Sequence, residues 1–480
     1  MAFGIDFGTT NSAVVYENRL LDDGGRPFPS VVAIHPDTGE VYCGTKAKND
    51  RSRLTAAGFM VIRSVKRLLE SDQSWLVTGK LLKPVDVAAI LFGHLKEHAR
   101  RSGNTDGHVL ERAVVSIPVS WPAARRRLLR QAAAQAGIEV QSFVSEPTAA
   151  YFRCRKDLPP CRRVAVFDWG GGTLDIAVLA IEGARIQELG TAVREEAGDA
   201  LDVELARWCH TQLVRGVPNA PAFDDMSAED RENLVVECER AKVDLSKLPE
   251  RDIVLPKYGG RTSLPTVTLS REDLARVSKP LVDRAIETLL SGLEKARVST
   301  DDVEVFLVVG GSSRLASLQA RLDELFPSRV FNTPTPDWDV AEGAALLAHQ
   351  ALEPVLLQSV CLSLADGESL QLVGPGTPFD DRPRPFTLGV VEATNSAMLV
   401  FSESIDGTAS ANRLRFIHAM SVPTMGFFLE PIDLTLTLTE DLTMSTEGKS
   451  RNGNGSDSVR WEYSGLRFAY DMPNGVARHE

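Results

Sequence analysis

The segments FGIDFGTTNSAVVY (residues 3–16) and VFDWGGGTLDIAVL (residues 166–179) repeat one pattern far apart in the chain. Each holds an apolar strand, an aspartate, an aromatic residue, a glycine-rich turn, a threonine and a second apolar strand. Glycine permits positive φ angles and the close approach of a ligand to the backbone. The three glycines 170–172 exceed what a two-residue hairpin turn needs. The repeat predicts two lobes of related architecture, each of which presents an aspartate and a turn to a shared cleft. For either segment alone, a plain glycine-rich hairpin is the alternative.

Residues 1–352 alternate short apolar strands with long amphipathic helices, the pattern of an α/β protein. Pro122 is placed to open one helix, which Gly137 ends. Ser270 and Asp273 form a capping box at the start of another helix. A third glycine turn lies in FLVVGGSSRLASLQ (306–319), which reads as a strand, a turn and a helix.

From about residue 363 the pattern becomes all-β. Leu434, Leu436 and Leu438 alternate with threonines, as in a strand with one buried face. Residues 353–362, which begin EPVLLQSV, are predicted to be an apolar linker, with the first strand of the all-β part as the alternative.

Composition limits the classes of function. The chain of 480 residues is long for one domain, and its 43% apolar and 25% charged residues are those of a globular protein. The net charge, 53 − 65 = −12, argues against nucleic acid as a main partner. We expect no membrane span and no cleaved signal peptide. The six cysteines lack metal-ligand spacing, which favours a reducing, cytoplasmic location.

The facing turns suit a polyphosphate, which needs backbone N–H donors, a hard cation and a positive group near the reacting phosphorus. Thr9, Thr10 and Thr173 add hydroxyl donors, and Asp6 and Asp168 are placed to hold a hydrated magnesium ion. None of the turns is a Walker A loop or a dinucleotide-binding fingerprint. A nucleotide would therefore be held by a two-sided clamp.

The segment VECERAKVDLSK places Glu239, Lys242 and Ser246 on one helix stripe. Such a stripe could meet a purine and a ribose. A surface Glu–Lys pair with a solvent-facing serine is the alternative.

Eight motifs occur in the order and approximate spacing of the DnaK-type heat-shock chaperones: GIDFGTTNS, SVKRLLE, AVVSIPVSW, SEPTAAYF, FDWGGGTLD, CERAKVDLS, VVGGSSRL and TPDWDVAEGAA. The chain resembles this seventy-kilodalton class, part of the actin and sugar-kinase superfamily, over roughly residues 1–350. The resemblance implies a two-lobed actin-like ATPase domain, with lobe I at about 1–162 and 338–352 and lobe II at about 163–337. It also implies a small β-sandwich-like domain at 363–480, here without a helical lid.

The resemblance also implies the site residues. Asp6 and Asp168 match the carboxylates that organise magnesium, and Lys66 matches the lysine that positions the attacking water. Glu146, Asp175 and Thr173 match groups around that water, the metal and the phosphate. The remaining matches bind the nucleotide, ATP or ADP: Gly8, Thr9, Thr10, Gly170, Gly171, Gly172, Thr173, Glu239, Lys242, Ser246, Gly310, Gly311, Ser312, Arg314 and Asp337. The resemblance also allows potassium as a cofactor beside magnesium. For Lys66 the alternative is a solvated helix lysine, and for Glu146 a helix-capping carboxylate.

Pro118 and Arg126 match residues that relay the nucleotide state to the second domain, although Arg125 and Arg127 fit a solvated basic helix face equally well. Three positions depart from the family. Ala197 replaces a glycine, Ser359 stands where the family has an acidic linker residue, and Trp169 is bulkier than the usual aliphatic residue.

Three functions follow from this reading. The first is a slow ATP-hydrolysing, chaperone-like protein that couples its cleft to the binding of extended peptides, with a J-type co-chaperone and a nucleotide-exchange factor as expected partners. The second is an ATP-dependent module that binds one dedicated protein partner. The third, a small-molecule kinase, fits less well because of the added β-domain and the Lys66 motif.

Overall fold

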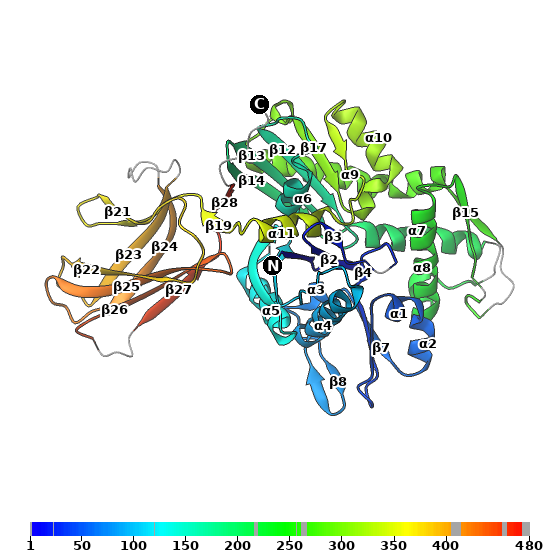
Figure 1. Cartoon of the computed structure of the whole chain (residues 1–480), viewed down its shortest axis with the longest axis horizontal. Coiled ribbons are helices and arrows are strands. Elements are labelled where there is room, and N and C mark those ends of the chain that lie inside the picture. Colours follow the sequence, from blue (N-terminus) through cyan, green and yellow to red (C-terminus); the bar gives the residue numbers. More distant parts are fainter. Residues whose placement is uncertain are drawn as a thin grey trace.

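The computed structural model describes residues 2–22, 24–119, 121–215, 219–255, 257–260, 266–404, 414–453 and 458–472. The segment 473–480, the predicted end of the β-sandwich-like domain, lies outside these ranges, as does part of the predicted loop 450–458. Figure 1 shows a two-lobed α/β body with a pair of β-sheets standing to one side.

Lobe I is built on the sheet order β11-β10-β1-β2-β3, with β4 paired to β2. Its strands are β1 (Phe3–Asp6), β2 (Asn11–Tyr16), β3 (Arg19–Leu20), β4 (Phe28–Pro29), β10 (Arg112–Ile117) and β11 (Glu139–Ser145). Its helices are α4 (Pro84–Ser102), α5 (Ala123–Gln135), α6 (Glu146–Cys154) and α11 (Asp339–His349). An outer part holds β5 (Val31–Ile34), β6 (Val41–Cys43), α1 (Gly44–Asn49), α2 (Arg51–Ala56), β7 (Met60–Arg63), α3 (Val65–Leu68), β8 (Trp75–Val77) and β9 (Lys80–Leu82).

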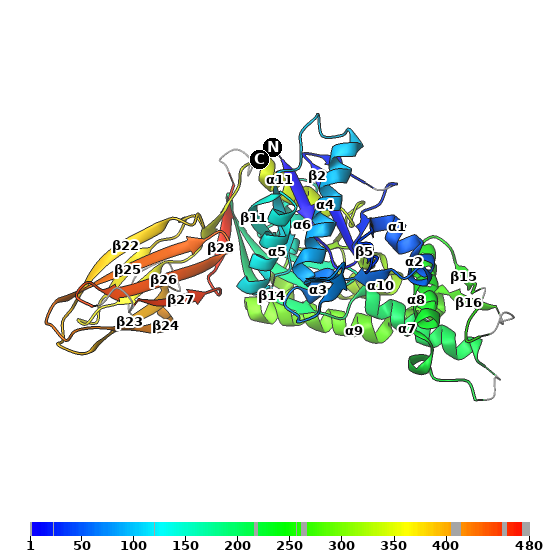
Figure 2. The same ribbon diagram turned by 90° about the horizontal axis from the view of Figure 1, so that it is seen from below.

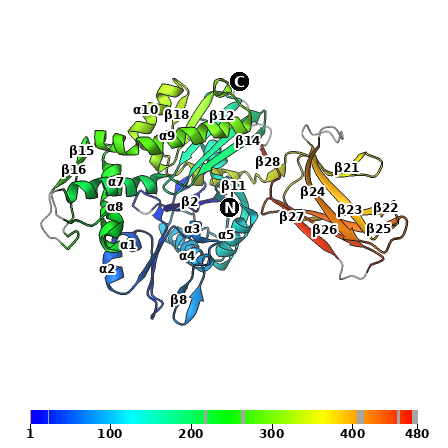
Figure 3. The same ribbon diagram turned by 180° about the vertical axis from the view of Figure 1, so that it is seen from behind.

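Lobe II repeats the plan on the sheet order β18-β17-β12-β13-β14. Its strands are β12 (Arg163–Trp169), β13 (Leu174–Glu182), β14 (Arg185–Arg194), β17 (Val305–Val309) and β18 (Val330–Asn332). Helices α9 (Arg271–Ala296) and α10 (Ala316–Leu325) belong to this lobe, and α9 packs along β13 and β14 (Figure 3). Its outer part holds α7 (Gly198–Leu213), α8 (Ala228–Asp244), β15 (Glu250–Ile253) and β16 (Val267–Ser270).

The repeated sequence pattern forms the same structure in both lobes, as predicted. Each copy is an antiparallel hairpin, β1–β2 in lobe I and β12–β13 in lobe II, with Asp6 opposite Ala13 and Asp168 opposite Asp175. The amide of Gly170 donates to the carbonyl of Thr173 (3.0 Å) and closes the second turn. The capping box of α9 at Ser270 is confirmed as well.

The two sheets of residues 360–463, called the β-domain from here on, are ordered β21-β20-β23-β24 and β22-β25-β26-β27. Figure 2 shows them as two layers extending from the body. Their strands are β20 (Val360–Ser363), β21 (Ser369–Val373), β22 (Pro383–Val390), β23 (Ser396–Ser404), β24 (Leu414–Pro423), β25 (Glu430–Thr439), β26 (Thr443–Ser450) and β27 (Val459–Tyr463). Strand β25 alternates buried and half-buried residues, as its leucines predict.

Two short strands tie the β-domain to lobe II. Strand β28 (Phe468–Asp471) pairs with β14, and β19 (Pro354–Leu356) pairs with β28, so the lobe II sheet has seven strands. The residues expected as an apolar linker therefore begin with a strand of the lobe II sheet, and the β-domain starts with β20 at Val360. The division of the chain into domains stays a prediction.

Helix α11 packs tightly against α6 and β1 of lobe I. Gly343 lies against the backbone of Ala149 in α6, and Gly4 of β1 lies against the backbone of Ala341 and Ala345. A Cβ atom at either glycine would overlap these backbone atoms, so glycine sets the distance between the elements. No helix in the described residues is long and apolar enough to cross a membrane.

Candidate functional site

The two glycine-rich turns meet across the lobes. A Cβ atom at Gly171 would overlap the side chain of Thr10, and one at Gly172 would overlap that of Thr9. The Thr10 hydroxyl donates to a carboxylate oxygen of Asp199 (3.0 Å), at the start of α7. The structure thus brings the predicted phosphate-binding residues of both hairpins into direct contact with each other.

The third turn joins the same place. Gly310 has a φ angle of 82°, and a Cβ there would overlap the Asp168 carboxylate and the Trp169 carbonyl. The Ser312 hydroxyl donates to the carbonyl of Gly170 (2.8 Å). Gly8 lies in the lobe I turn, and its carbonyl accepts from Ser30 (2.8 Å).

A buried ion pair lies behind these turns. The ammonium group of Lys66 is 2.6 Å from a carboxylate oxygen of Glu146, and both side chains are nearly inaccessible to solvent. Lys66 lies on the short helix α3, and Glu146 is the first residue of α6, whose N-cap is Ser145. Burial acts to lower the pKa of Lys66, but the negative charges of Glu146 and Asp6 outweigh it and raise that pKa. Lys66 is therefore a buried cation and not a solvated helix lysine.

Three aspartates surround this pair. Burial and the neighbouring charge of Glu146 raise the pKa of Asp6 to about 6 and that of Asp175 to about 7. The pKa of Asp168 is raised well above its usual value by burial and then by the other carboxylates. Four acidic groups thus crowd around one lysine, an arrangement typical of a functional site.

This crowding suits a divalent cation. Asp6 accepts from the hydroxyl of Ser116 (2.8 Å), and one oxygen of Asp175 accepts from the amide of Val119 (3.2 Å). The other oxygen of Asp175 is buried without a hydrogen-bond partner among the described residues. Within those residues, no three His, Cys, Asp or Glu side chains are arranged to hold a metal directly. A hydrated magnesium ion, which keeps several waters, fits the carboxylates better than a fully protein-coordinated ion.

On the predicted adenosine side, one ion pair joins the two lobes and a second lies within lobe II. Glu239 on α8 binds Lys48 on α1 (2.7 Å), and Lys242 binds Asp202 on α7 (2.7 Å). Figure 1 shows α1 and α2 beside α8 at this rim. Ser246 is exposed, and its hydroxyl donates to the Val243 carbonyl (2.6 Å), a bond within its own segment.

Arg314 and Asp337 form an ion pair (3.3 Å), and a Cβ at Gly311 would approach the Asp337 carboxylate. Three further residues contact the predicted site and were not predicted from the sequence: Lys48, Asp199 and Asp202. The two aspartates lie in the acidic stretch EAGDALD, which offered a signal, whereas Lys48 has no local signal.

Trp169 belongs to the hydrophobic core of lobe II. It is fully buried, and its ring lies edge-on to that of Phe167, with 6.0 Å between centroids. The large side chain of Trp169 therefore fills the core next to the glycine turn.

The arginines of α5 contact different parts of the molecule. Arg125 binds Glu70 (2.7 Å), and Arg127 binds Glu462 of the β-domain. Arg126, the predicted relay residue, is buried, and burial lowers its pKa to about 10 although Asp441 and Glu462 act against this shift. The helix therefore faces the β-domain and is not a fully solvated basic surface.

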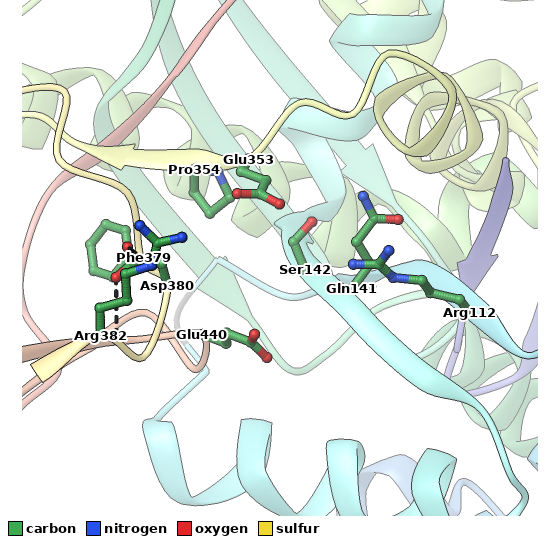
Figure 4. Close-up of a pocket in the computed structure, with 9 residues that line it drawn as sticks. All are labelled: Arg112, Gln141, Ser142, Glu353, Pro354, Phe379, Asp380, Arg382 and Glu440. Atoms are coloured by element: carbon green, nitrogen blue, oxygen red, sulfur yellow. Dashed lines mark hydrogen bonds and ion pairs between the residues drawn. The ribbon is translucent and has the colours of Figure 1, made fainter. Parts of the chain in front are cut away.

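Figure 4 shows a separate pocket of about 210 Å³ at the junction of lobe I with the β-domain. Its lining residues include none of the predicted site: Arg112, Gln141, Ser142, Glu353, Pro354, Phe379, Asp380, Arg382 and Glu440. The charges in it are largely paired within the protein, as between Arg382 and Asp380 (3.5 Å) and between Glu440 and Arg130 (3.1 Å). The pocket is thus distinct from the predicted nucleotide site at the glycine turns.

Comparison with known proteins gives a consistent result. A family model described as "Hsp70 protein" matches residues 69–366. The chaperone protein DnaK of Metamycoplasma hominis is 30% identical over 419 residues, which cover 84% of this chain and 67% of that relative. The DnaK of Mycoplasmopsis pulmonis is 31% identical over 418 residues (84% and 66%). That of Mycoplasmoides gallisepticum is 32% identical over 388 residues (76% and 63%). The aligned part spans about two thirds of the relatives' length.

Proposed function

Because the chain belongs to the Hsp70 family, we propose that its lobes bind and hydrolyse ATP and that the β-domain binds extended peptides under control of the bound nucleotide. The observation that carries this proposal is the buried Lys66–Glu146 pair, enclosed by Asp6, Asp168 and Asp175 behind two facing glycine turns. This arrangement supplies a cation for the developing phosphate charge and carboxylates for water and metal.

The residues of the proposed site have different roles, according to where they lie. Backbone amides of the turns, with Thr9, Thr10 and Thr173, bind the phosphates from both lobes. Asp6 and Asp168 would hold a hydrated magnesium ion, which neutralises phosphate charge when bound. Lys66 stabilises negative charge at the γ-phosphate.

Glu146 and Asp175 orient the attacking water. With a pKa of about 7, Asp175 is suited to accept a proton from that water. The water attacks the γ-phosphorus, the bond to the bridging oxygen breaks, and ADP and phosphate leave.

On the adenosine side, Glu239, Lys242 and Ser246 face the nucleoside, opposite the turn of Gly310, Gly311 and Ser312. Arg314 and Asp337 lie beside that turn. The pair of Glu239 with Lys48 joins the outer parts of the two lobes, whereas the pair of Lys242 with Asp202 lies within lobe II. When the nucleotide binds, these side chains exchange some of their hydrogen bonds with each other for hydrogen bonds to the nucleotide.

The Lys66→Ala variant tests the mechanism. We expect turnover to fall about 100-fold or more, because a charge that stabilises the transition state is removed. The affinity for ATP should change only a few-fold, since the turns supply most phosphate contacts. Steady-state hydrolysis and nucleotide titration measure the two quantities.

Lys279→Ala is the matched control, because Lys279 is exposed and pairs with Asp283 on α9. It should leave both quantities unchanged. Unchanged hydrolysis in Lys66→Ala with intact ATP binding would refute the assigned role.

The β-domain exposes apolar side chains in the turn between β24 and β25: Met425, Phe427, Phe428 and Leu429 are each more than half exposed. Such side chains are of the kind that contact extended apolar peptides. We expect a peptide library to show general binding of these peptides, with affinities that differ between ATP and ADP. J-type co-chaperones and an exchange factor would then act on this cycle. Binding of no peptide would favour the dedicated-partner function instead.

A further inference from the structure

Strand β28 returns from the β-domain to the edge of lobe II. Tyr470 pairs with Ile186 of β14, and the amide of Met472 donates to the carbonyl of Ala184 (2.7 Å). The guanidinium of Arg185 binds both carboxylate oxygens of Asp471, at 2.6 and 2.8 Å. A two-point contact of this kind fixes direction as well as distance. The strand is therefore held in one register on the sheet.

Tyr470 of β28 also contacts lobe I. Its side chain is 2% exposed, and its hydroxyl donates to the carbonyl of Phe143 (2.9 Å). Its ring meets that of Phe152 edge-on, with 5.7 Å between centroids. Phe143 lies on β11, which ends directly before Glu146, and Phe152 lies on α6, which begins with Glu146.

A second residue of lobe II holds the same segment. The carboxylate of Glu188 on β14 accepts from the hydroxyls of Ser145 and Thr148, which lie on either side of Glu146. The Ser145 hydroxyl also caps α6 by accepting from the amide of Thr148 (3.3 Å). Residues 143–148 are thus fixed by β14 and β28 together.

We propose that Tyr470 is a positioning residue for ATP hydrolysis. By holding the carbonyl of Phe143, it fixes the end of β11 and therefore the place of Glu146 beside Lys66. Since β28 follows β27 after residues 464–467, it links the β-domain directly to the segment that holds Glu146. The inference rests on the proposed ATPase function and adds a route from the β-domain to the reacting groups.

The test is Tyr470→Phe, which removes the hydroxyl and keeps the ring packing. We expect kcat for ATP to fall three- to ten-fold and KM to change less than two-fold, because Tyr470 lies away from the predicted nucleotide contacts. The backbone amides of residues 143–146 and 148 should exchange hydrogen faster than in the wild type, while the midpoint of thermal unfolding stays nearly the same. Tyr42→Phe is the control, since it removes a hydroxyl bonded to Glu40 at the surface.

The outcomes separate the two proposals. An active wild type with unchanged kcat and unchanged exchange in Tyr470→Phe overturns the role of Tyr470 alone. A wild type that binds ATP without hydrolysing it overturns the proposed function, and with it any role of Tyr470 in hydrolysis. If Tyr470→Phe does not fold, Asp471→Ala makes the same comparison by freeing β28 from Arg185. The same fall in kcat and faster exchange are expected there, and their absence counts against the proposal.

Discussion

At the scale of single residues, the burial of one carboxyl group sets a measurable pH dependence. Asp339 opens α11, is inaccessible to solvent, and accepts from the hydroxyls of Thr333 and Thr335. Burial raises its pKa from 3.8 to about 6. Between these values the folded state binds more protons than the unfolded state, so the stabilising contribution, present below about pH 4, is lost as the pH rises through 6. This loss corresponds to about 3 kcal/mol for a shift of about two units.

Asp339→Asn should therefore flatten the pH dependence of the unfolding midpoint between pH 4 and 7, because the amide cannot ionise. Thermal denaturation at several pH values measures the effect. Asp283→Asn, a change on the surface of α9, serves as the control and should follow the wild type. A variant at Asp339 that also follows the wild type would contradict the assignment.

At the scale of elements, two helical glycines give opposite expectations. Gly343 on α11 touches the backbone of Ala149, whereas a Cβ at Gly93 on α4 would meet nothing within 4 Å. We expect Gly343→Ala to lower the free energy of unfolding by about 1–3 kcal/mol, because the backbone must shift. Gly93→Ala should raise it by about 0.5–1 kcal/mol, because alanine restricts the unfolded chain. Denaturant titration compares both, and equal effects would argue against the close packing of α11 on α6.

At the scale of the whole molecule, Arg130 of α5 fastens the β-domain to lobe I. It binds Asp441 (2.9 Å) and both the carboxylate and the carbonyl of Glu440, and it donates to Val140 of its own lobe (2.6 Å). Arg130→Ala should loosen this junction, seen as faster hydrogen exchange in the turn between β25 and β26 and a larger radius of gyration in solution scattering. Arg100→Ala, which breaks an exposed pair within α4, should change neither. An unaltered junction would show that the contacts of Arg130 are not needed to hold the β-domain in place.

The sequence predicts what local patterns encode. The two hairpins, the capping box at Ser270 and the alternating strand β25 each arise from neighbouring residues, and all are found. The resemblance to a family placed Lys66 and Glu146 in one predicted site, although 80 residues separate them in the chain. The contacts of Lys48 with Glu239 and of Thr10 with Asp199 join distant segments without a local pattern, and so they were not predicted.

The pairing of β28 with β14 was likewise not predicted, because Arg185 and Asp471 are 286 residues apart. This pairing has a consequence for synthesis on the ribosome, because the two strands that pair are made at very different times. Strand β14 is translated long before β28, so its backbone edge stays open while the rest of lobe II and the β-domain emerge. An open edge pairs readily with other strands. During this interval the nascent chain is exposed to incorrect strand pairing. The interval ends when Phe468–Asp471 leaves the exit tunnel and pairs with β14.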